Sequence, residues 1–436
     1  MIVRPPLSHP TLALLCAVTL LLACGDEEPD EGQAEGTEGE TAGEGEGDGD
    51  GDGEGEEETA GDGDGDPGPS REELIAELSE RGPYEVGYKL LELSYIPPGT
   101  LEERTLPIQV WYPAVPDSGA PKASYTVGGI VELPSSSVGA LDAPPISADG
   151  PFPIAVYSHG SGGEGLLAYP YAERFASHGW ITFSPSHVGN TALELLNDTG
   201  DPFIQVAVNR PHDISAILDE ADGGFAGDEV GAAADLSQVF VFGHSFGGYT
   251  SFSIGGATLD YQTLLGACLP SDCAYLEQPE VAEAFAAGFG DPRVDAIAPQ
   301  APALITNFGD GDLAGLRVAT MLQSGKLDIT TPDATEAQPA WDAIAHRNDV
   351  WVDLPFGAHY SFITICHDLD PELLALFQPD NVNDGCGPEF TPTTETVPVL
   401  TTYLLAFARH EVLGEVQWSV LLEGETLHPE FDLLRH

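Results

Sequence analysis

The chain has 436 residues, of which 72 are acidic and 14 basic, so its formal net charge at pH 7 is −58. Such a negative surface argues against nucleic acid and anionic membrane surfaces as partners. Hydrophobic residues make up 42% of the chain, enough to build a folded domain with a core.

The first segment has the pattern of a targeting sequence. Arg4 precedes an apolar run at residues 12–23, which is too short to cross a bilayer but suits a secretory signal peptide. The run ends in Leu-Leu-Ala-Cys-Gly, which resembles the lipobox of bacterial lipoproteins. We therefore predict a signal peptide over residues 1–23 and a lipid-modified Cys24 that anchors an exported protein to the cell envelope. An ordinary signal peptide with a chance cysteine is the alternative.

Residues 24–70 follow as an acidic, glycine-rich segment with no basic side chain. Like charges repel one another, and apolar side chains that could form a core are lacking, so we predict a disordered tether. Some of the carboxylates follow the spacing of a calcium loop, but no flanking helices would hold such a loop. Residues 71–436 remain, a length that suits one α/β domain with insertions. We expect this domain to be monomeric.

The folded part begins with a short helix at 71–80, introduced by Ser70, and two antiparallel strands at 84–95 and 105–112. From residue 153 onward, apolar strands and helices alternate. Strands are expected at 154–158, 180–184, 239–243, 294–298, 318–324 and 351–354, and helices at 169–178, 211–221, 246–254 and 397–412. Strands that are apolar on both faces and separated by helices predict a mostly parallel central sheet covered by helices on both faces, which is the α/β-hydrolase fold.

Two stretches, 257–292 and 367–393, do not fit this alternation. A disulfide-stapled cap over the active site and ordinary surface insertions are equally consistent with them. Cys16 leaves with the leader and Cys24 is taken by lipid, so four cysteines remain for an exported protein, which predicts two disulfides. Three pairings are possible, and the local ones are Cys268–Cys273 and Cys366–Cys386.

Residues 239–248 carry the clearest chemical signal. Four apolar residues with strand character lead into Gly-His-Ser-Phe-Gly and then into a helix-compatible run. A serine between glycines at a sharp strand-to-helix turn is typical of a nucleophile elbow, because only small residues avoid a clash behind it. We therefore predict Ser245 as the nucleophile of a serine hydrolase.

The nucleophile needs a base, and the base needs an acid to orient it. In this fold they follow the serine in the order acid, then histidine. Asp328 lies in the loop that leaves one predicted strand, and His359 lies in the loop after the next, so we predict them as acid and base. Three other carboxylates lie near the acid position, namely Asp312, Asp333 and Asp353.

The oxyanion of the reaction needs two backbone N–H donors. Phe246, directly after the nucleophile, should supply one, and Ser161, in the glycine-rich loop after an early strand, the other. We expect His159 to support the glycine-rich loop, His244 to pack beside the nucleophile and His187 to line the pocket. C-x-x-C and H-E-x-x-H are absent from the sequence, so we predict no metal and no cofactor.

Several sequence blocks occur together in one order. They are G-P-Y-E-V-G at 82–87, V-W-Y-P-A at 110–114, S-H-G-S-G-G at 158–163, A-S-H-G-W at 176–180, R-P-H-D at 210–213 and G-H-S-F-G-G at 243–248. This combination resembles the bacterial relatives of platelet-activating-factor acetylhydrolase, which grade into dienelactone-hydrolase-like esterases, over most of residues 82–412. The family often has a larger apolar residue at position 161 and an acidic one at position 186, where this chain has Ser161 and Ser186.

The resemblance implies an esterase for short-acyl or phospholipid-like esters. Its triad would be Ser245, Asp328 and His359, and its oxyanion hole would be formed by Ser161 and Phe246. The partner would be a small-molecule or lipid ester, and the membrane would be contacted through the lipid anchor alone. A polyester or cutin-type hydrolase and a non-catalytic surface binding module are the alternatives.

Overall fold

The structure is a computed structural model and describes residues 68–98, 102–127, 131–309, 311–370, 372, 374 and 383–436. The predicted signal peptide, the lipidation site Cys24 and the tether up to residue 67 lie outside these residues. Within the described part of the chain, no helix combines the length and apolarity needed to cross a membrane.

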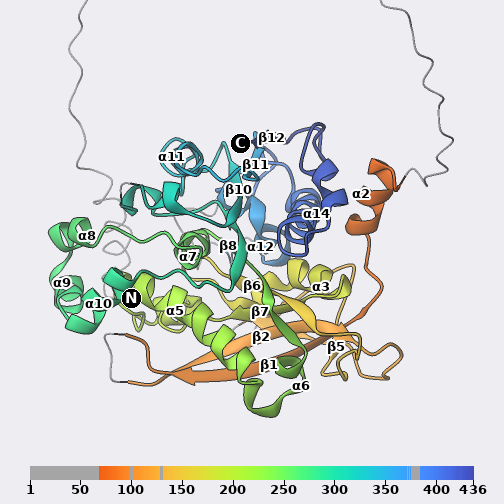
Figure 1. Ribbon diagram of the computed structural model, residues 1–436, viewed down its shortest axis with the longest axis horizontal. Coiled ribbons are helices and arrows are strands. Elements are labelled where there is room, and N and C mark those ends of the chain that lie inside the picture. Colours follow the sequence, from red (N-terminus) through yellow and green to blue (C-terminus); the bar gives the residue numbers. More distant parts are fainter. Residues whose placement is uncertain are drawn as a thin grey trace, which may run out of the picture. The chain divides into compact units, whose positions relative to one another are not determined.

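Among the described residues, ten strands form one mixed sheet in the order β12-β11-β10-β9-β8-β6-β7-β2-β1-β5 (Figure 1). Neighbouring strands are parallel from β7 to β11, and β5 is parallel to β1. β2 is antiparallel to both β1 and β7, and β12 is antiparallel to β11. The central strands are β6 (Phe152–Ser158), β7 (Ile181–Pro185), β8 (Ala234–His244), β9 (Val294–Gln300), β10 (Ala319–Gly325) and β11 (Val350–Leu354). The outer strands are β1 (Glu85–Tyr95), β2 (Arg104–Ala114), β5 (Leu141–Asp142) and β12 (Asp432–Arg435), and β3 (Tyr125–Val127) pairs separately with β4 (Val131–Leu133).

Helices cover both faces of this sheet. On one face lie α5 (Phe203–Asp222) and α7 (Phe246–Ile254), and on the other lie α3 (Tyr169–Ser177) and α14 (Thr393–Glu411). Shorter helices are α2 (Arg71–Ser79), α4 (Ala192–Leu196), α6 (Glu229–Ala232), α11 (Ala337–Ala343) and α12 (Ile365–Asp368), and single 3₁₀ turns are η1 (Gly165–Ala168), η2 (Phe225–Gly227), η3 (Ile305–Asn307), η4 (Leu313–Gly315), η5 (His359–Phe362) and η6 (Val416–Leu421). The prediction of an α/β-hydrolase layout is confirmed.

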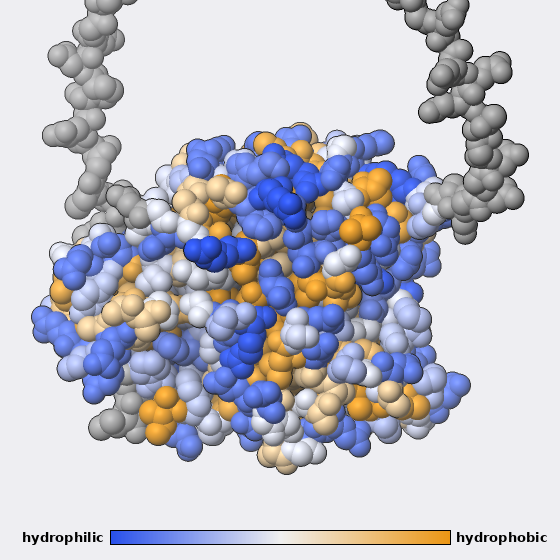
Figure 2. Space-filling view, in the orientation of Figure 1, coloured by the Kyte–Doolittle hydropathy of each residue, from blue (hydrophilic) through white to orange (hydrophobic). Residues whose placement is uncertain are grey.

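The strand β8 belongs to both core layers. Val239 and Val241 pack into the layer with α5 and α7, while Phe240 and Phe242 pack into the layer with α3 and α14. All four side chains are fully buried. This explains why the strand is continuously apolar, because side chains alternate between the two faces of a sheet that is covered on both. The outer surface is different: the face in Figure 2 is mostly hydrophilic, with apolar side chains in separate patches.

The prediction that a helix begins at residue 211 was wrong. The helix α5 begins eight residues earlier, at Phe203, and Pro211 lies inside it. A proline cannot donate to the carbonyl four residues back, which is normally unfavourable within a helix. Here the hydroxyl of Tyr249 donates to that carbonyl, Ala207 O, at 2.9 Å. A tertiary contact therefore replaces the missing helical hydrogen bond.

The stretch 257–292 folds into three short helices, α8 (Tyr261–Ala267), α9 (Pro270–Leu276) and α10 (Pro279–Ala287). Their apolar side chains Leu264, Leu276 and Val281 join the core layer of α5 and α7. Figure 1 shows the three helices grouped beside α5 at one end of the domain. The disulfide Cys268–Cys273 lies between α8 and α9, with a Cα–Cα distance of 5.3 Å.

Candidate active site

The predicted nucleophile, Ser245, stands where β8 ends and α7 begins. Its φ of 58° and ψ of −116° place it in strained backbone that costs a non-glycine residue on the order of 1–3 kcal/mol. The turn requires Gly247, because a Cβ at that position would lie 1.8 Å from the carbonyl oxygen of Ser158. The Ser245 N–H donates to the carbonyl of Gln300 on the neighbouring strand at 2.8 Å. The motif thus holds the serine at the carboxyl edge of the sheet.

The predicted base and acid lie beside it. Nε2 of His359, in the loop after β11, is 3.0 Å from Oγ of Ser245. The other ring nitrogen, Nδ1, is 2.9 Å from Oδ2 of Asp328, in the loop after β10. The side chains are almost buried, and Ser245, the most open, is 9% exposed. The structure therefore brings the three predicted residues together in the geometry of a Ser-His-Asp triad.

The electrostatics of this group suit proton transfer. Burial alone would raise the pKa of Asp328, but the charge and hydrogen bond of His359, together with hydrogen bonds from Thr331, hold it below its usual value. For His359, burial works to lower the pKa, yet the Asp328 carboxylate raises it above 6.5. The acid therefore stays ionised and stabilises the imidazolium that forms when the base accepts a proton.

Thr331, which the sequence analysis did not single out, completes the hydrogen bonds of the acid. Its N–H donates to Oδ1 of Asp328 at 2.6 Å, and its hydroxyl donates to Oδ2 at 2.7 Å. The N–H of Thr330 also donates to Oδ1, at 2.8 Å. These bonds fix the carboxylate, which keeps one oxygen aimed at His359. The pattern Asp-x-Thr-Thr is the local signal that could have shown it, since such residues bond an aspartate that begins a turn.

A second carboxylate, Asp384, joins the acid loop to the base loop. It accepts hydrogen bonds from the N–H of Ile329 at 3.2 Å, from the N–H of Thr330 at 2.9 Å and from the N–H of His359 at 3.4 Å. Its own carbonyl accepts from the N–H of Tyr360 at 2.9 Å. Only 2% of Asp384 is exposed. Sequence reasoning missed this residue, because nothing near it in the chain indicates that it returns to the loops of Asp328 and His359.

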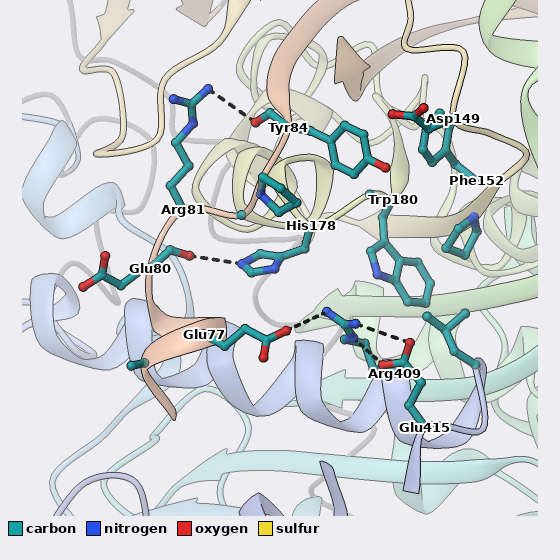
Figure 3. A pocket seen from close by; sticks show the side chains of 16 residues that line it. Glu77, Glu80, Arg81, Tyr84, Asp149, Phe152, His178, Trp180, Arg409 and Glu415 are labelled. Carbon is teal, nitrogen blue, oxygen red and sulfur yellow. Dashed lines mark hydrogen bonds and ion pairs between the residues drawn. The ribbon is translucent and has the colours of Figure 1, made fainter. Parts of the chain in front are cut away.

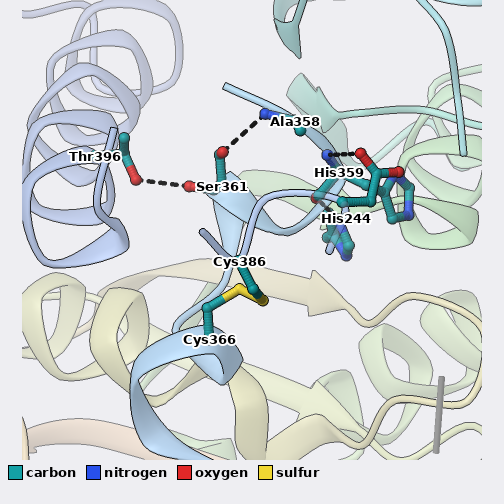
Figure 4. The surroundings of a disulfide bond; sticks show 8 residues. His244, Ala358, His359, Ser361, Cys366, Cys386 and Thr396 are labelled. Carbon is teal, nitrogen blue, oxygen red and sulfur yellow. Dashed lines mark hydrogen bonds between the residues drawn. A yellow bond between two sulfur atoms is a disulfide. The ribbon is translucent and has the colours of Figure 1, made fainter. Parts of the chain in front are cut away.

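The disulfide Cys366–Cys386 holds the segment that carries Asp384. Its Cα–Cα distance is 5.2 Å, and it spans 20 positions of the chain. Figure 4 shows the bond close to the turn that carries His359, with His244 beside that histidine. In the same view, the Ser361 hydroxyl accepts from the N–H of Ala358 at 2.8 Å. The base loop is thus tied down on several sides.

The glycine-rich loop predicted to hold the oxyanion adjoins the nucleophile. A Cβ at Gly160 would lie 3.2 Å from Cβ of Ser245, so the loop and the serine are in close contact. Residues 160–163 form a turn in which the N–H of Gly163 donates to the carbonyl of Gly160 at 3.0 Å and Gly162 has a φ of 72°. Ser161 is exposed and Phe246 is the first residue of α7. Among the described backbone hydrogen bonds, neither of their N–H groups donates to a protein acceptor.

His159 and His244 are buried beside these loops as expected. His187, predicted to line the pocket, is instead completely buried between Asp213 and Ser158. Burial lowers the pKa of His244 to about 3, so the neutral ring donates from Nε2 to the carbonyl of His359, at 2.7 Å. His159 and His187 also have pKa values well below 6.5, first through burial and then through the nearby charge of Arg210. Nε2 of His159 accepts from the N–H of His187 at 3.0 Å. All three are therefore neutral groups that fix backbone.

A cleft of about 760 Å³ lies elsewhere, and no member of the triad lines it. Figure 3 shows both arginines of this cleft paired: Arg409 bonds Glu415 and approaches Glu77, and Arg81 donates to the carbonyl of Tyr84. The positive charges of the cleft are thus satisfied within the protein. Among the described residues, no group of His, Cys, Asp or Glu has the arrangement of a metal site.

Comparison with known proteins gives one kind of match. No protein-family model matches the sequence, and no curated protein matches it. A solved ferulic acid esterase from Streptomyces cinnamoneus superposes with a TM-score of 0.58 and 20% identity, over 81% of this chain and 97% of that one. At this identity the likeness concerns the fold. The chain therefore has the α/β-hydrolase fold, which it shares with a bacterial ferulic acid esterase.

Proposed function

We propose that the protein is a serine carboxylester hydrolase that works through an acyl-enzyme. The observation that carries this proposal is the continuous chain of hydrogen bonds from Ser245 through His359 to Asp328. A strained serine at the edge of the sheet, within hydrogen-bond distance of an imidazole, has no structural purpose that a simpler residue would not serve. A binding module would need neither partner in this order.

The residues would act as follows. His359 Nε2 takes the proton of Ser245 Oγ while that oxygen attacks the ester carbonyl. The oxyanion that develops accepts hydrogen bonds from the free N–H groups of Phe246 and Ser161, and the N-terminus of α7 adds a favourable dipole. When the intermediate collapses, His359 passes the proton to the departing alcohol. Water, deprotonated by the same histidine, then releases the acid.

The substrates we propose are short-acyl or phospholipid-like esters that carry no net negative charge. The surplus of acidic residues repels anionic lipids and anionic acids. The resemblance to platelet-activating-factor acetylhydrolase relatives supports short acyl chains. Esters of ferulic acid are the second candidate, because the solved neighbour is a ferulic acid esterase.

Polymeric esters are a third candidate, favoured by the open rim of the site. Ser161 is exposed. Leu327 and Ile329, which flank Asp328 in the chain, expose 41% and 71% of their surface. These two apolar side chains, next to Asp328 in the chain, would contact a polyester or cutin chain. Polymeric esters differ from short-acyl and ferulate esters because a longer stretch of the substrate must contact the protein surface.

The test uses the full chain in mild detergent, compared with Ser245→Ala. Initial rates are measured on 4-nitrophenyl esters from acetate to decanoate, on methyl ferulate and on a polyester film, with fluorophosphonate labelling in parallel. We expect labelling and hydrolysis to vanish in the variant. The rank of the substrates separates the three candidates. A folded wild-type protein that neither hydrolyses an ester nor takes the label would overturn the proposal in favour of a binding module.

We also propose that the enzyme is exported and anchored to the bacterial cell envelope through lipid on Cys24. The support is the lipobox-like sequence before that residue. Metabolic labelling with a fatty acid, followed by fractionation, tests it. Cys24→Ala should lose the label and leave the membrane fraction, and an unlabelled wild-type protein would contradict the anchor.

A further inference from the structure

Arg210 begins the R-P-H-D block, to which the proposed reaction assigns no role. It lies on α5, directly beneath the glycine-rich loop, and is only 1% exposed. Burying a charge is costly unless the group is paired and hydrogen-bonded. The contacts of the guanidinium therefore indicate why it is there.

Its two terminal nitrogens donate mainly to the loop. Nη1 donates to the carbonyl of His159, and Nη2 donates to the carbonyl of Gly160 at 3.2 Å. Nη2 also donates to Oδ1 of Asn190 at 2.5 Å, and the amide of Asn190 donates to the hydroxyl of Ser161 at 3.0 Å. A single planar guanidinium thus holds two successive carbonyls of the loop. Through Asn190 it also holds the side chain of Ser161.

These contacts set the direction of the oxyanion donor. A trans peptide is planar, and its N–H points opposite to its C=O. The carbonyl of Gly160 belongs to the same peptide as the N–H of Ser161. When Arg210 draws that carbonyl toward α5, the N–H of Ser161 is turned to the other side of the loop, away from the helix. Nδ1 of His159 lies 2.7 Å from the same carbonyl and reinforces this orientation.

The guanidinium also contacts the other half of the oxyanion hole. Its Cζ lies 4.9 Å from the centre of the Phe246 ring, within the range of a cation–π contact. The N–H of Phe246 is the second expected donor. Arg210 therefore contacts both halves of the proposed oxyanion hole. It bonds the carbonyl of Gly160, which shares a peptide with the N–H of Ser161, and it packs on the ring of Phe246.

A charge network keeps Arg210 in place. Burial lowers its pKa, and the carboxylate of Asp213 acts in the opposite direction. A guanidinium begins from a value above 12, so it stays a cation at neutral pH. Asp213 also bonds Nδ1 of His187 at 2.7 Å, and Nε2 of that ring lies 2.9 Å from the hydroxyl of Ser158.

Ser158, His187 and Asp213 thus have the connectivity of a second triad. Ser158 is completely buried, however, and Nη1 of Arg210 lies 3.4 Å from its oxygen. A nucleophile that no substrate can reach does no chemistry. The group instead fixes the end of β6, from which the glycine-rich loop starts.

We propose that Arg210 is the positioning residue of the oxyanion hole, holding the Ser161 and Phe246 donors in one geometry. This inference rests on the proposed function, because it concerns the same reaction. Arg210 does not touch the substrate. It acts through the peptide that it orients, so its loss should weaken binding of the tetrahedral state and leave binding of the ester nearly unchanged.

The test is Arg210→Lys, which keeps the charge but cannot span two carbonyls. We expect kcat to fall by about 10- to 100-fold with KM changed by less than about threefold, since removing one oxyanion donor outright costs about 100- to 1,000-fold. Affinity for a trifluoromethyl ketone, which forms a tetrahedral adduct on the serine, should fall by the same factor as kcat. Amide hydrogen exchange of residues 158–163 should become faster.

Arg104→Gln is the matched control. Arg104 bonds the same Asp213, at 3.1 Å, and its other described partners are Asp201 and the carbonyl of Val188. The substitution Arg104→Gln therefore removes a charge near Arg210 without removing any bond to the glycine-rich loop. We expect a lower melting temperature, with kcat and exchange at 158–163 like those of the wild type.

The outcomes separate the two proposals. A folded Arg210→Lys protein whose kcat and ketone affinity stay within about threefold of wild type overturns the inference and leaves the esterase intact. A wild-type protein without esterase activity overturns the function, and the exchange measurement then still tests the loop. If Arg210→Lys does not fold, Asn190→Ala removes the same link from the other side, and unchanged exchange and ketone affinity in that variant would equally refute the role.

Discussion

The carboxylate of Asp384 accepts both a backbone and a side-chain hydrogen bond from Thr330, at 2.9 Å from the nitrogen and 2.6 Å from the hydroxyl. Thr330 is two residues after the predicted acid Asp328, while Asp384 lies 54 positions further along the chain. A distant segment therefore supports the acid, and the same carboxylate reaches the backbone of His359.

Asp384→Asn should impair catalysis. The amide keeps one acceptor oxygen, and its NH₂ group would face N–H donors, so the two catalytic loops should separate slightly. We expect kcat/KM to fall by about 10-fold or more, the loss typical when catalytic geometry loosens. The charge of Asp384 also helps to raise the pKa of His359. Without it, the acid limb of the kcat/KM profile should move to lower pH.

A purely structural role would lower the melting temperature of Asp384→Asn but leave that limb where it is. Four titratable groups surround the imidazole. Asp328 bonds its Nδ1, the rings of His244 and Tyr360 pack against it, and the carboxylate of Asp384 bonds the backbone N–H of His359. His244 and Tyr360 are uncharged at neutral pH, because burial lowers the pKa of the first to about 3 and raises that of the second. The two aspartates are therefore the charges that can move the limb.

Asp328→Asn should reduce kcat by about 10,000-fold, as expected when the orienting acid loses its charge and the imidazole its tautomer.

In the wild type, His359 must be neutral to act as a base and its pKa lies above 6.5. The kcat/KM profile should therefore rise with pH, with a midpoint above 6.5. A profile that is already flat at pH 6 would contradict the ion pair.

The same shift predicts a pH dependence of stability. The folded state raises the pKa of His359, so the protonated ring stabilises the fold. This contribution is complete below the unfolded value near 6.5 and is lost as pH rises through the higher folded value. Urea unfolding of the wild type and of His359→Gln should be compared from about pH 5 to about pH 9, a range that brackets the unfolded pKa of the imidazole. The difference in unfolding free energy between the two proteins should shrink as pH rises.

Removing the Cys366–Cys386 bond by a double alanine substitution should lower the free energy of unfolding by about 3 kcal/mol, the amount expected for a loop of this size. It should also lower kcat, because the bond holds the segment that carries Asp384. Cys268→Ala with Cys273→Ala is the matched control. That bond closes a shorter loop away from the triad, so stability should fall by about 2 kcal/mol while kcat stays the same. Equal loss of kcat in both pairs would refute the special role of the first.

Gly247→Ala should nearly abolish activity, since its methyl group would overlap the carbonyl of Ser158 and push the nucleophile from its place. Gly266→Ala provides the comparison within another helix, where an added Cβ meets nothing within 4 Å. That change should raise the unfolding free energy by about 1 kcal/mol through helix propensity and leave kcat alone. Esterase rates and thermal unfolding of the two variants check both statements, and an active Gly247→Ala enzyme would refute the steric argument.

Local patterns predicted the parts of this molecule that depend on local causes. The buried strand before the nucleophile is apolar throughout, and Ser70 does begin a helix, with its hydroxyl accepting from the N–H of Glu73 at 3.3 Å. The loop positions of Asp328 and His359 followed from the order of strands. What could not be predicted depends on tertiary contacts: the start of α5 depends on a hydroxyl from α7, and Asp384 reaches the site through a fold of the chain that no neighbouring residue encodes.

The position of β8 in both core layers means that the three residues of the predicted triad are not held equally firmly. Ser245 extends from a strand packed on both faces, whereas its acid and base sit on loops that depend on one disulfide and one carboxylate from a distant segment. Cooperative units of a protein open at different free energies, and loops do so first. On heating, esterase activity should therefore be lost while the sheet is still folded. The activity should return on cooling for as long as the Cys366–Cys386 disulfide is intact.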